Sequence, residues 1–203
     1  MQNFIFFDVG ANNGRDSIPR AANDPNAIVY AFEPTPELIS ELKTKTSHLK
    51  NYHIVEKAVS NFEGKTKFFI AGQLDWGCSS LLQFSDKSQN NWPGRTDFKV
   101  TNEIEVEVIT LKSFIENNNI DHIDYLHIDT QGSDLKVLEG LGEKISIVRA
   151  GVMEAGSHTD ILYYNQNTAA DSIKFLNENG FSVSRIESND VFTNEVNIHF
   201  HRN

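Results

Sequence analysis

Residues 4–14 read Phe4-Ile5-Phe6-Phe7-Asp8-Val9-Gly10-Ala11-Asn12-Asn13-Gly14, an apolar run that ends in an acid and enters a turn containing two glycines. The run is apolar on both faces, which is typical of a central strand in a parallel sheet. Glycine allows positive φ and close approach of the backbone to a ligand. The stretch therefore predicts a core strand followed by a binding turn.

Strand and helix patterns alternate along the rest of the chain. Ile28 to Glu33 predicts a second strand, after which Thr35, Pro36 and Glu37 supply the cap, the first-turn proline and the first-turn acid of a helix. This alternation indicates an α/β protein whose mostly parallel sheet is flanked by helices. Further elements are expected as strands at residues 53–55, 66–70, 104–108, 123–128 and 145–153, as helices after Thr110, Ser133 and Thr168, and as an antiparallel edge hairpin of residues 181–187 and 195–201 with a turn at 188–190.

Composition and charge narrow the class of protein. The 203 residues are 39% hydrophobic, which predicts a single domain over residues 1–203 with a proper core. The formal net charge of -10 repels phosphodiesters and anionic headgroups, so neither nucleic acid nor a membrane is expected as a partner. A single cysteine and the lack of a recognisable signal peptide predict a reduced, cytoplasmic protein. Two possibilities stay open: a minimal enzyme, or one domain of a longer polypeptide.

A segment of about residues 71–103 breaks the alternation. It is rich in Ser, Asn, Gln, Asp and Gly, yet it also contains Trp76, Phe84, Trp92 and Phe98. Long loops in compact domains are usually functional or disordered, and the aromatic residues argue against disorder. We expect an insertion over the acceptor site, and we give equal weight to the alternative that its aromatic residues only pack the loop onto the sheet.

Two acids end the first two strands, where ligands bind in open parallel sheets. A dinucleotide fingerprint requires glycine where Asn12 and Arg15 stand, and Asp8 suits a cation better than a pyrophosphate. Glu33 lies 19 residues beyond Gly14 and can accept hydrogen bonds from both hydroxyls of a ribose. Together the two acids favour a nucleoside with an ammonium group and no phosphates, a description that S-adenosylmethionine meets. An NAD(P)-dependent oxidoreductase is the disfavoured alternative.

Four blocks of sequence occur in this order along the chain: Asp8 to Gly14, Ala31-Phe32-Glu33-Pro34, Lys57-Ala58-Val59-Ser60 and Ile128-Asp129-Thr130-Gln131-Gly132, with Ser79-Ser80-Leu81 and Val152-Met153-Glu154 in addition. They resemble those of FkbM-type methyltransferases, and the resemblance spans almost the whole chain. It implies a Rossmann-like, seven-stranded methyltransferase sandwich and methyl transfer from S-adenosylmethionine to oxygen. It also implies that hydroxyls of sugars or polyketides are frequent acceptors.

The resemblance also implies which residues hold the cofactor. The ribose would lie at Glu33. The methionine part would lie at Asp8, Gly10, Asn12 and Gly14, and the adenine beside Lys57, Ala58 and Val59. The full expected set adds Ala11, Asn13, Asp16, Pro34 and Asp129. The chain differs from many relatives at His127, where lysine is frequent, and at Gln131, where glutamate is frequent.

A hydroxyl acceptor has to lose its proton, so a base is expected near the methyl group. The candidates, in order of preference, are Asp129 and Glu154, which end neighbouring strands, and His127, which shares a side of its strand with Asp129. Alternatively, Asp129 and Glu154 hold Mg²⁺, which would lower the pKa of a bound hydroxyl.

The acceptor is expected to be a small molecule or glycan. Its candidate contacts are Trp76, Ser79, Ser80, Trp92 and His158, since sugar sites combine aromatic faces with hydrogen-bonding groups. No zinc site is expected, because the histidines lack ligand spacing. The differences at His127 and Gln131 leave a second alternative, a glycan-binding module that has kept the fold without the chemistry.

Overall fold

A computed structural model describes residues 2–71, 76–95, 98–189 and 194–203. In the described residues, no helix has the length and apolar character needed to cross a membrane. The elements follow in the order β1 (Phe4–Val9), α1 (Ile18–Asn23), β2 (Ala27–Phe32), α2 (Pro36–Thr46), β3 (Tyr52–Val55), β4 (Ala58–Val59), β5 (Gly64–Ala71), η1 (Trp76–Cys78), α3 (Ser88–Asn91), β6 (Val100–Ile109), α4 (Leu111–Asn117), β7 (Tyr125–Ile128), α5 (Asp134–Glu139), η2 (Gly142–Ile147), β8 (Ala150–Gly156), α6 (Ala169–Glu178), β9 (Phe181–Ser188) and β10 (Glu195–Arg202).

The main sheet has seven strands in the order β3-β2-β1-β7-β8-β10-β9. β1, β2, β3, β7 and β8 pair in parallel, whereas β10 is antiparallel to both β8 and β9. The expected fold class and its antiparallel edge hairpin are confirmed. Strand order reverses between β1 and β7, so their carboxyl ends form the crevice in which such sheets bind ligands.

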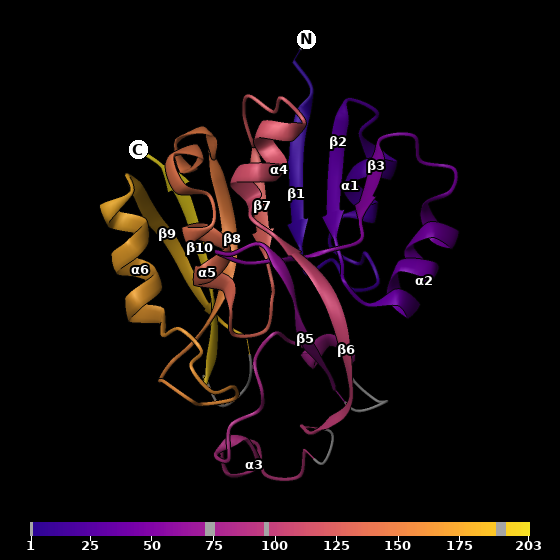
Figure 1. The fold of residues 1–203 in the computed structure, drawn as a ribbon. Helices are drawn as coiled ribbons and strands as arrows, with labels where there is room; N and C mark the ends of the chain where they lie inside the picture. Colours follow the sequence, from indigo (N-terminus) through magenta and orange to yellow (C-terminus); the bar gives the residue numbers. More distant parts are fainter. Residues whose placement is uncertain (1, 72–75, 96–97, 190–193) are drawn as a thin grey trace.

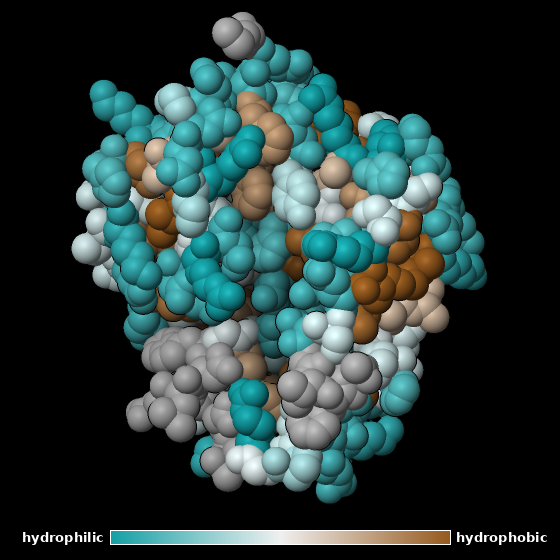
Figure 2. Space-filling model, turned by 180° about the vertical axis from the view of Figure 1, so that it is seen from behind, coloured by the Kyte–Doolittle hydropathy of each residue, from teal (hydrophilic) through white to brown (hydrophobic). Residues whose placement is uncertain are grey.

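Helices cover the two faces of this sheet unequally. The larger core lies between the sheet and α4, α5 and α6, and it includes Phe7, Leu126 and Met153. A smaller core holds Phe6 and Val29 beneath α1 and α2, on the opposite face. Figure 1 shows α4, α5 and α6 in front of the sheet. Figure 2 shows the opposite side, where hydrophilic residues cover most of the surface.

A second, three-stranded sheet of order β4-β6-β5 stands at the carboxyl edge of the main sheet. β5 and β6 form an antiparallel ladder with alternating burial, so Phe68 and Val106 face the small core of this sheet. In Figure 1 the paired strands β5 and β6 extend past the tips of the β1 and β2 arrows. Phe68 of β5 reaches the crevice from this second sheet.

Two loops pack together beyond the same edge, and we call them the cap: residues 77–95, residue 98 and residues 157–167. The rings of Phe84 and Tyr163 stack with centroids 5.1 Å apart, and the Ser85 N–H donates to the Leu162 carbonyl at 2.7 Å. The buried cluster of the cap consists of Trp92, Phe98, Ile161, Leu162 and Tyr163. Trp92 is thus a packing residue of the cap, as in the alternative given equal weight above.

Two expected strands begin later than the sequence predicts. Residues 142–147 form η2, so β8 starts at Ala150 and not at residue 145. Ile123 makes only a single bridge, to Val148, and β7 starts at Tyr125. A short apolar run fits a buried helical turn as well as a buried strand, so hydrophobicity could not separate the two. Asp190, in the expected 188–190 turn, lies outside the described residues.

Candidate functional site

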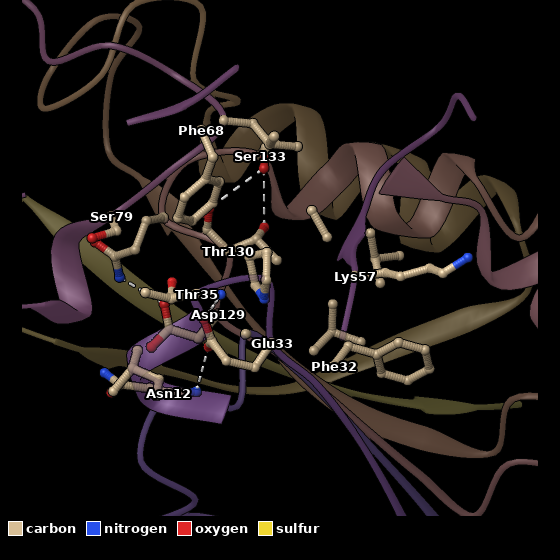
Figure 3. A pocket seen from close by; sticks show the side chains of 18 of the residues that line it. Asn12, Phe32, Glu33, Thr35, Lys57, Phe68, Ser79, Asp129, Thr130 and Ser133 are labelled. Carbon is tan, nitrogen blue, oxygen red and sulfur yellow. Dashed lines mark hydrogen bonds between the residues drawn. The ribbon is translucent and has the colours of Figure 1, made fainter. Parts of the chain in front are cut away.

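An open cavity of about 570 Å³ lies at the carboxyl ends of β1, β2 and β7. This volume includes the space that is open to solvent at the mouth of the cavity. Figure 3 shows the side chains of Asn12, Glu33 and Asp129 gathered at one end of the cavity, with Phe32 and Lys57 at the other. The lining residues are Val9, Gly10, Asn12, Phe32, Glu33, Pro34, Thr35, Leu38, Lys57, Ala58, Val59, Phe68, Gly77, Ser79, Leu81, Asp129, Thr130, Gln131 and Ser133.

The Glu33 carboxylate accepts hydrogen bonds from the backbone after β1 and after β2. It accepts the Asn12 N–H at 2.9 Å and the Thr35 N–H at 2.8 Å, one on each oxygen. A carboxylate has about four acceptor positions, so each oxygen keeps one for a ligand. Burial raises the pKa of Glu33 to about 7, even though these hydrogen bonds oppose the shift.

The turn after β1 brings its backbone close to β7. Gly10 has φ 85°, and a Cβ at this position would lie 1.9 Å from the Asp129 carbonyl oxygen, so only glycine fits. Asn12 has φ 49° and lines the cavity. The other expected contacts in this turn do not line the cavity: Ala11 and Gly14 are buried in packing, and Asn13 and Asp16 are exposed.

Asp8 lies beneath the cavity and does not line it. It is opposite His127 in the β1–β7 register, and the two side chains therefore share one face of the sheet. His127 Nδ1 donates to Asp8 Oδ1 at 2.7 Å, while Asp8 is 1% exposed. Burial opposes the charged ring, but the hydrogen bond and charge of Asp8 raise the pKa of His127 to about 9.

This pair changes the expected roles of both residues. At neutral pH His127 is a cation bound to Asp8, so a role as proton acceptor is not favoured. Neither residue lines the cavity, so Asp8 would act on a ligand only through the turn that follows it, and not by direct contact.

The far end of the cavity is apolar and suits a purine ring. Ala58 and Val59 line it together with Phe32 and Leu38, and all four are largely buried. Lys57 pairs with Glu107 at 2.9 Å at the rim. The expected adenine residues and Pro34 are therefore together in the cavity wall.

Three side chains form a polar cluster next to the cavity. The Gln131 side-chain nitrogen donates to Asp129 Oδ1 at 2.6 Å and to Glu154 Oε2 at 3.0 Å. Asn189 donates to the other oxygen of Glu154. Asp129 and Gln131 line the cavity, whereas Glu154 is 5% exposed and lies behind them.

Burial controls the ionisation of this cluster. It raises the pKa of Asp129, against the hydrogen bond from Gln131, and it raises the pKa of Glu154 well above the usual range, with a further contribution from the charge of Asp129. Burial, followed by the charge of Asp129, raises the pKa of Asp134 to about 7. A carboxylate with a raised pKa is a stronger base than one in water.

The raised pKa values of Glu33, Asp134 and His127 predict that the stability of the folded chain falls as pH rises. The folded chain holds protons on Glu33 and Asp134 that the unfolded chain releases near its ordinary values, so this stabilisation is lost between about pH 4 and pH 7. The contribution of His127 is complete below about pH 6.5 and is lost as pH rises through about 9. We expect the Tm from calorimetry to fall by several degrees between about pH 5 and pH 9.

Two variants check the cause of this slope. Asp134→Asn should reduce the fall in Tm at the acidic end of the pH range, and His127→Gln should reduce it at the alkaline end. A Tm that is constant or rises over the range would contradict the expectation.

The residues expected to contact the acceptor lie in different parts of the structure. Ser79 lines the cavity, and its hydroxyl also accepts the Ala71 N–H at 3.0 Å. Ser80 is 1% exposed and donates to the Gln131 carbonyl at 2.7 Å, which is a structural contact. Trp92 is buried in the cap, and His158 is exposed away from the cavity. The side chain of Trp76 lies outside the described residues.

Several lining residues were not expected from the sequence. Thr130 and Ser133 belong to the loop that holds Asp129, so their neighbourhood in sequence was a usable signal. Leu81 comes from the insert and belongs to the Ser79-Ser80-Leu81 block, which was a usable signal, whereas Phe68 of β5 looks like an ordinary packing residue in the sequence. Gln131 was noticed only as a departure from a family pattern.

No cluster of three or more His, Cys, Asp or Glu side chains suited to a metal ion occurs among the described residues. Asp129 and Glu154 do approach each other, and the Gln131 amide lies between them. At one end of the cavity, each oxygen of the Glu33 carboxylate can accept one further hydrogen bond, and at the other end the side chains are apolar. That donor set fits the ribose and purine of a nucleoside.

Comparison with protein families gives one match. The model described as "Methyltransferase FkbM domain" matches residues 8–183. Comparison with curated proteins finds no match.

Three solved structures with a similar fold are methyltransferases of low sequence identity. A methyltransferase FkbM from Methylobacillus flagellatus KT is 11% identical, with a TM-score of 0.56, over 98% of this chain and 44% of that chain. Magnesium protoporphyrin IX methyltransferase from Synechocystis PCC 6803, solved with bound SAH, is 13% identical, with a TM-score of 0.56, over 99% and 75%. Precorrin-6y C5,15-methyltransferase from Geobacter metallireducens GS-15 is 13% identical, with a TM-score of 0.51, over 100% and 82%. This chain thus spans less than half of the FkbM structure.

Proposed function

This chain belongs to the family of FkbM-domain methyltransferases, and from that premise we propose that it methylates a hydroxyl oxygen of a sugar or glycan. The family makes it an S-adenosylmethionine-dependent methyltransferase. The nicotinamide alternative therefore falls away. The acceptor and the methylated atom are the proposed part.

The position and burial of Asp129 support an oxygen acceptor. Its carboxyl lines the cavity at the end of β7, and burial raises its pKa. A hydroxyl is a weak nucleophile until its proton is removed, and a placed base contributes roughly 10²–10⁴-fold to the rate. Asp129 is the proposed base, with Glu154 behind it.

The wall near Asp129 supports a polar, hydroxyl-rich acceptor. Ser79 offers a hydroxyl there, and the Phe68 ring adds an apolar surface. Sugars present both kinds of surface, hydroxyls at the rim and C–H groups on the ring face.

The bound cofactor supplies the methyl group, and the protein supplies alignment. Glu33 would hold the ribose, and the turn at Gly10 and Asn12 would support the amino-acid part. Fixing donor and acceptor in line removes much of the entropic cost of the reaction.

The test is a panel of sugars and glycans incubated with ¹³C-methyl S-adenosylmethionine, with and without a chelator. We expect a sugar product whose labelled methyl is bonded to oxygen, located by NMR. Loss of product with chelator, restored by Mg²⁺, would favour the cation alternative at Asp129 and Glu154.

Other outcomes would contradict the proposal. A methyl bonded only to nitrogen or carbon would exclude the oxygen assignment. Glycan binding by calorimetry with no S-adenosylhomocysteine formed would favour the non-catalytic glycan-binding module.

A further inference from the structure

Gln131 connects three segments of the candidate site through one side chain. Its amide nitrogen bridges Asp129 and Glu154, and its amide oxygen accepts the Tyr163 hydroxyl at 2.8 Å. Asp129 directly follows β7, whereas Glu154 lies within the neighbouring strand β8 and not at its end as expected, and Tyr163 belongs to the cap. A single carboxamide therefore joins the proposed base to the loops beyond the cavity.

We propose that Gln131 is a positioning residue, which holds the Asp129 carboxyl in the cavity wall while the Tyr163 hydroxyl anchors its side chain to the cap. This inference rests on the proposed function, because it concerns how the proposed base is placed.

The chemistry of the amide explains why this residue type fits. Two carboxyls on adjacent strands repel each other when both are charged, and low polarity around them strengthens the repulsion. An amide nitrogen has two N–H donors and can satisfy one oxygen of each.

The backbone at Gln131 adds an independent observation. Gln131 has φ 57°, a left-handed conformation that is uncommon for residues with a Cβ and persists only where the surroundings impose it. Ser80 donates to the Gln131 carbonyl at 2.7 Å and stabilises this conformation. The strained loop points the amide at the two carboxyls, which is typical of functional sites.

The contact with Tyr163 is rigid on the cap side. Tyr163 is 0% exposed, its ring stacks on Phe84, and its single hydroxyl proton is shared between the Gln131 amide oxygen and the Cys78 carbonyl, each 2.8 Å away. Gly132 packs against the same ring, where a Cβ would lie 2.8 Å from it. The Gln131 side chain is therefore held at both of its polar ends.

The test compares Gln131→Met and Tyr163→Phe with the control Tyr164→Phe. Tyr164 is the adjacent residue, is 37% exposed, and accepts the Asp86 N–H in the cap without contacting Gln131. Each tyrosine variant loses one hydroxyl and keeps its ring.

Turnover with the acceptor from the panel should fall about tenfold or more in Gln131→Met and in Tyr163→Phe, and by less than about twofold in Tyr164→Phe. The Kd for S-adenosylhomocysteine should stay within about threefold in all three. When Tyr163→Phe is added to Gln131→Met, turnover should fall by less than about a further twofold, because the two side chains act through one contact.

A spectroscopic arm needs no acceptor. In ¹⁵N-labelled protein, the Gln131 side-chain NH₂ protons should exchange with solvent at least about tenfold more slowly than those of exposed Gln83. Tyr163→Phe should speed this exchange, and Tyr164→Phe should leave it unchanged. If Gln131→Met does not fold, Gln131→Ala removes the same hydrogen bonds without filling the space, and it should lose turnover at least as strongly.

Full turnover in the Gln131 variants would overturn the proposal. It would also be overturned if Tyr163→Phe lowered turnover by the same factor in the unchanged chain and in Gln131→Met. Failure of the proposed function looks different. In that case Asp129→Asn keeps full turnover, or the methyl is found on an atom other than oxygen, whatever the exchange rates show.

Discussion

Replacing Glu33 with glutamine should weaken binding of S-adenosylhomocysteine about 100-fold or more. The Glu33 carboxyl lines the cavity and is expected to accept both ribose hydroxyls, and hydrogen bonds to a charged group contribute about 1.5–3 kcal/mol each. A glutamine amide would also turn an N–H toward the Asn12 or Thr35 N–H, which now donate to this carboxylate. Calorimetric titration of the purified chain measures the change directly.

Glu37→Gln is the matched control, because Glu37 is exposed in the first turn of α2 and lies outside the cavity. The Kd of Glu37→Gln for S-adenosylhomocysteine should stay within about twofold of that of the unchanged chain. An unaffected Kd in Glu33→Gln would show that the nucleoside binds elsewhere.

The affinity of the unchanged chain should also depend on pH. Because burial raises the pKa of Glu33 to about 7, the carboxylate that accepts the ribose hydroxyls is lost as pH falls through about 7. Affinity should therefore increase from about pH 6 to pH 8, and this slope should disappear in Glu33→Gln.

Asp129→Asn should lower turnover about 100-fold or more and leave the Kd for S-adenosylhomocysteine within about threefold. Asparagine keeps the size of the side chain and an oxygen that can accept from Gln131, but it cannot take a proton from the acceptor. Steady-state rates and titrations on the same preparation separate the two effects.

Asp121→Asn, in the loop before β7 and 80% exposed at its side chain, provides the control and should keep near-normal turnover. Glu154→Gln tests the second candidate base. If Glu154→Gln is inactive while Asp129→Asn is active, the proton goes to Glu154 instead.

Local sequence patterns predicted the elements of the fold well. The apolar run of β1, the cap and proline before α2 and the Thr168 cap of α6 are recognisable from a few neighbouring residues. The topological rule for parallel sheets then placed Gly10, Glu33 and Asp129 at one edge. All three line the cavity.

Residue contacts across the sheet could not be predicted in this way. Asp8 was expected to face a ligand, but it lies opposite His127, and that pairing depends on β1 and β7 being neighbours in one register. Phe68 enters the cavity from a second sheet: its strands at residues 66–70 and 104–108 were expected, but their separation from the main sheet was not.

The sequence by itself determined the order of strands and helices, the glycine turn and the acids at the strand ends, because these follow from the conformational preferences of adjacent residues. Only the tertiary structure decided that His127 neutralises Asp8 and that Gln131 joins Asp129, Glu154 and Tyr163. Hydrogen bonds and pKa shifts act over a few ångströms in space, and residues more than 100 positions apart become neighbours only when the sheet forms.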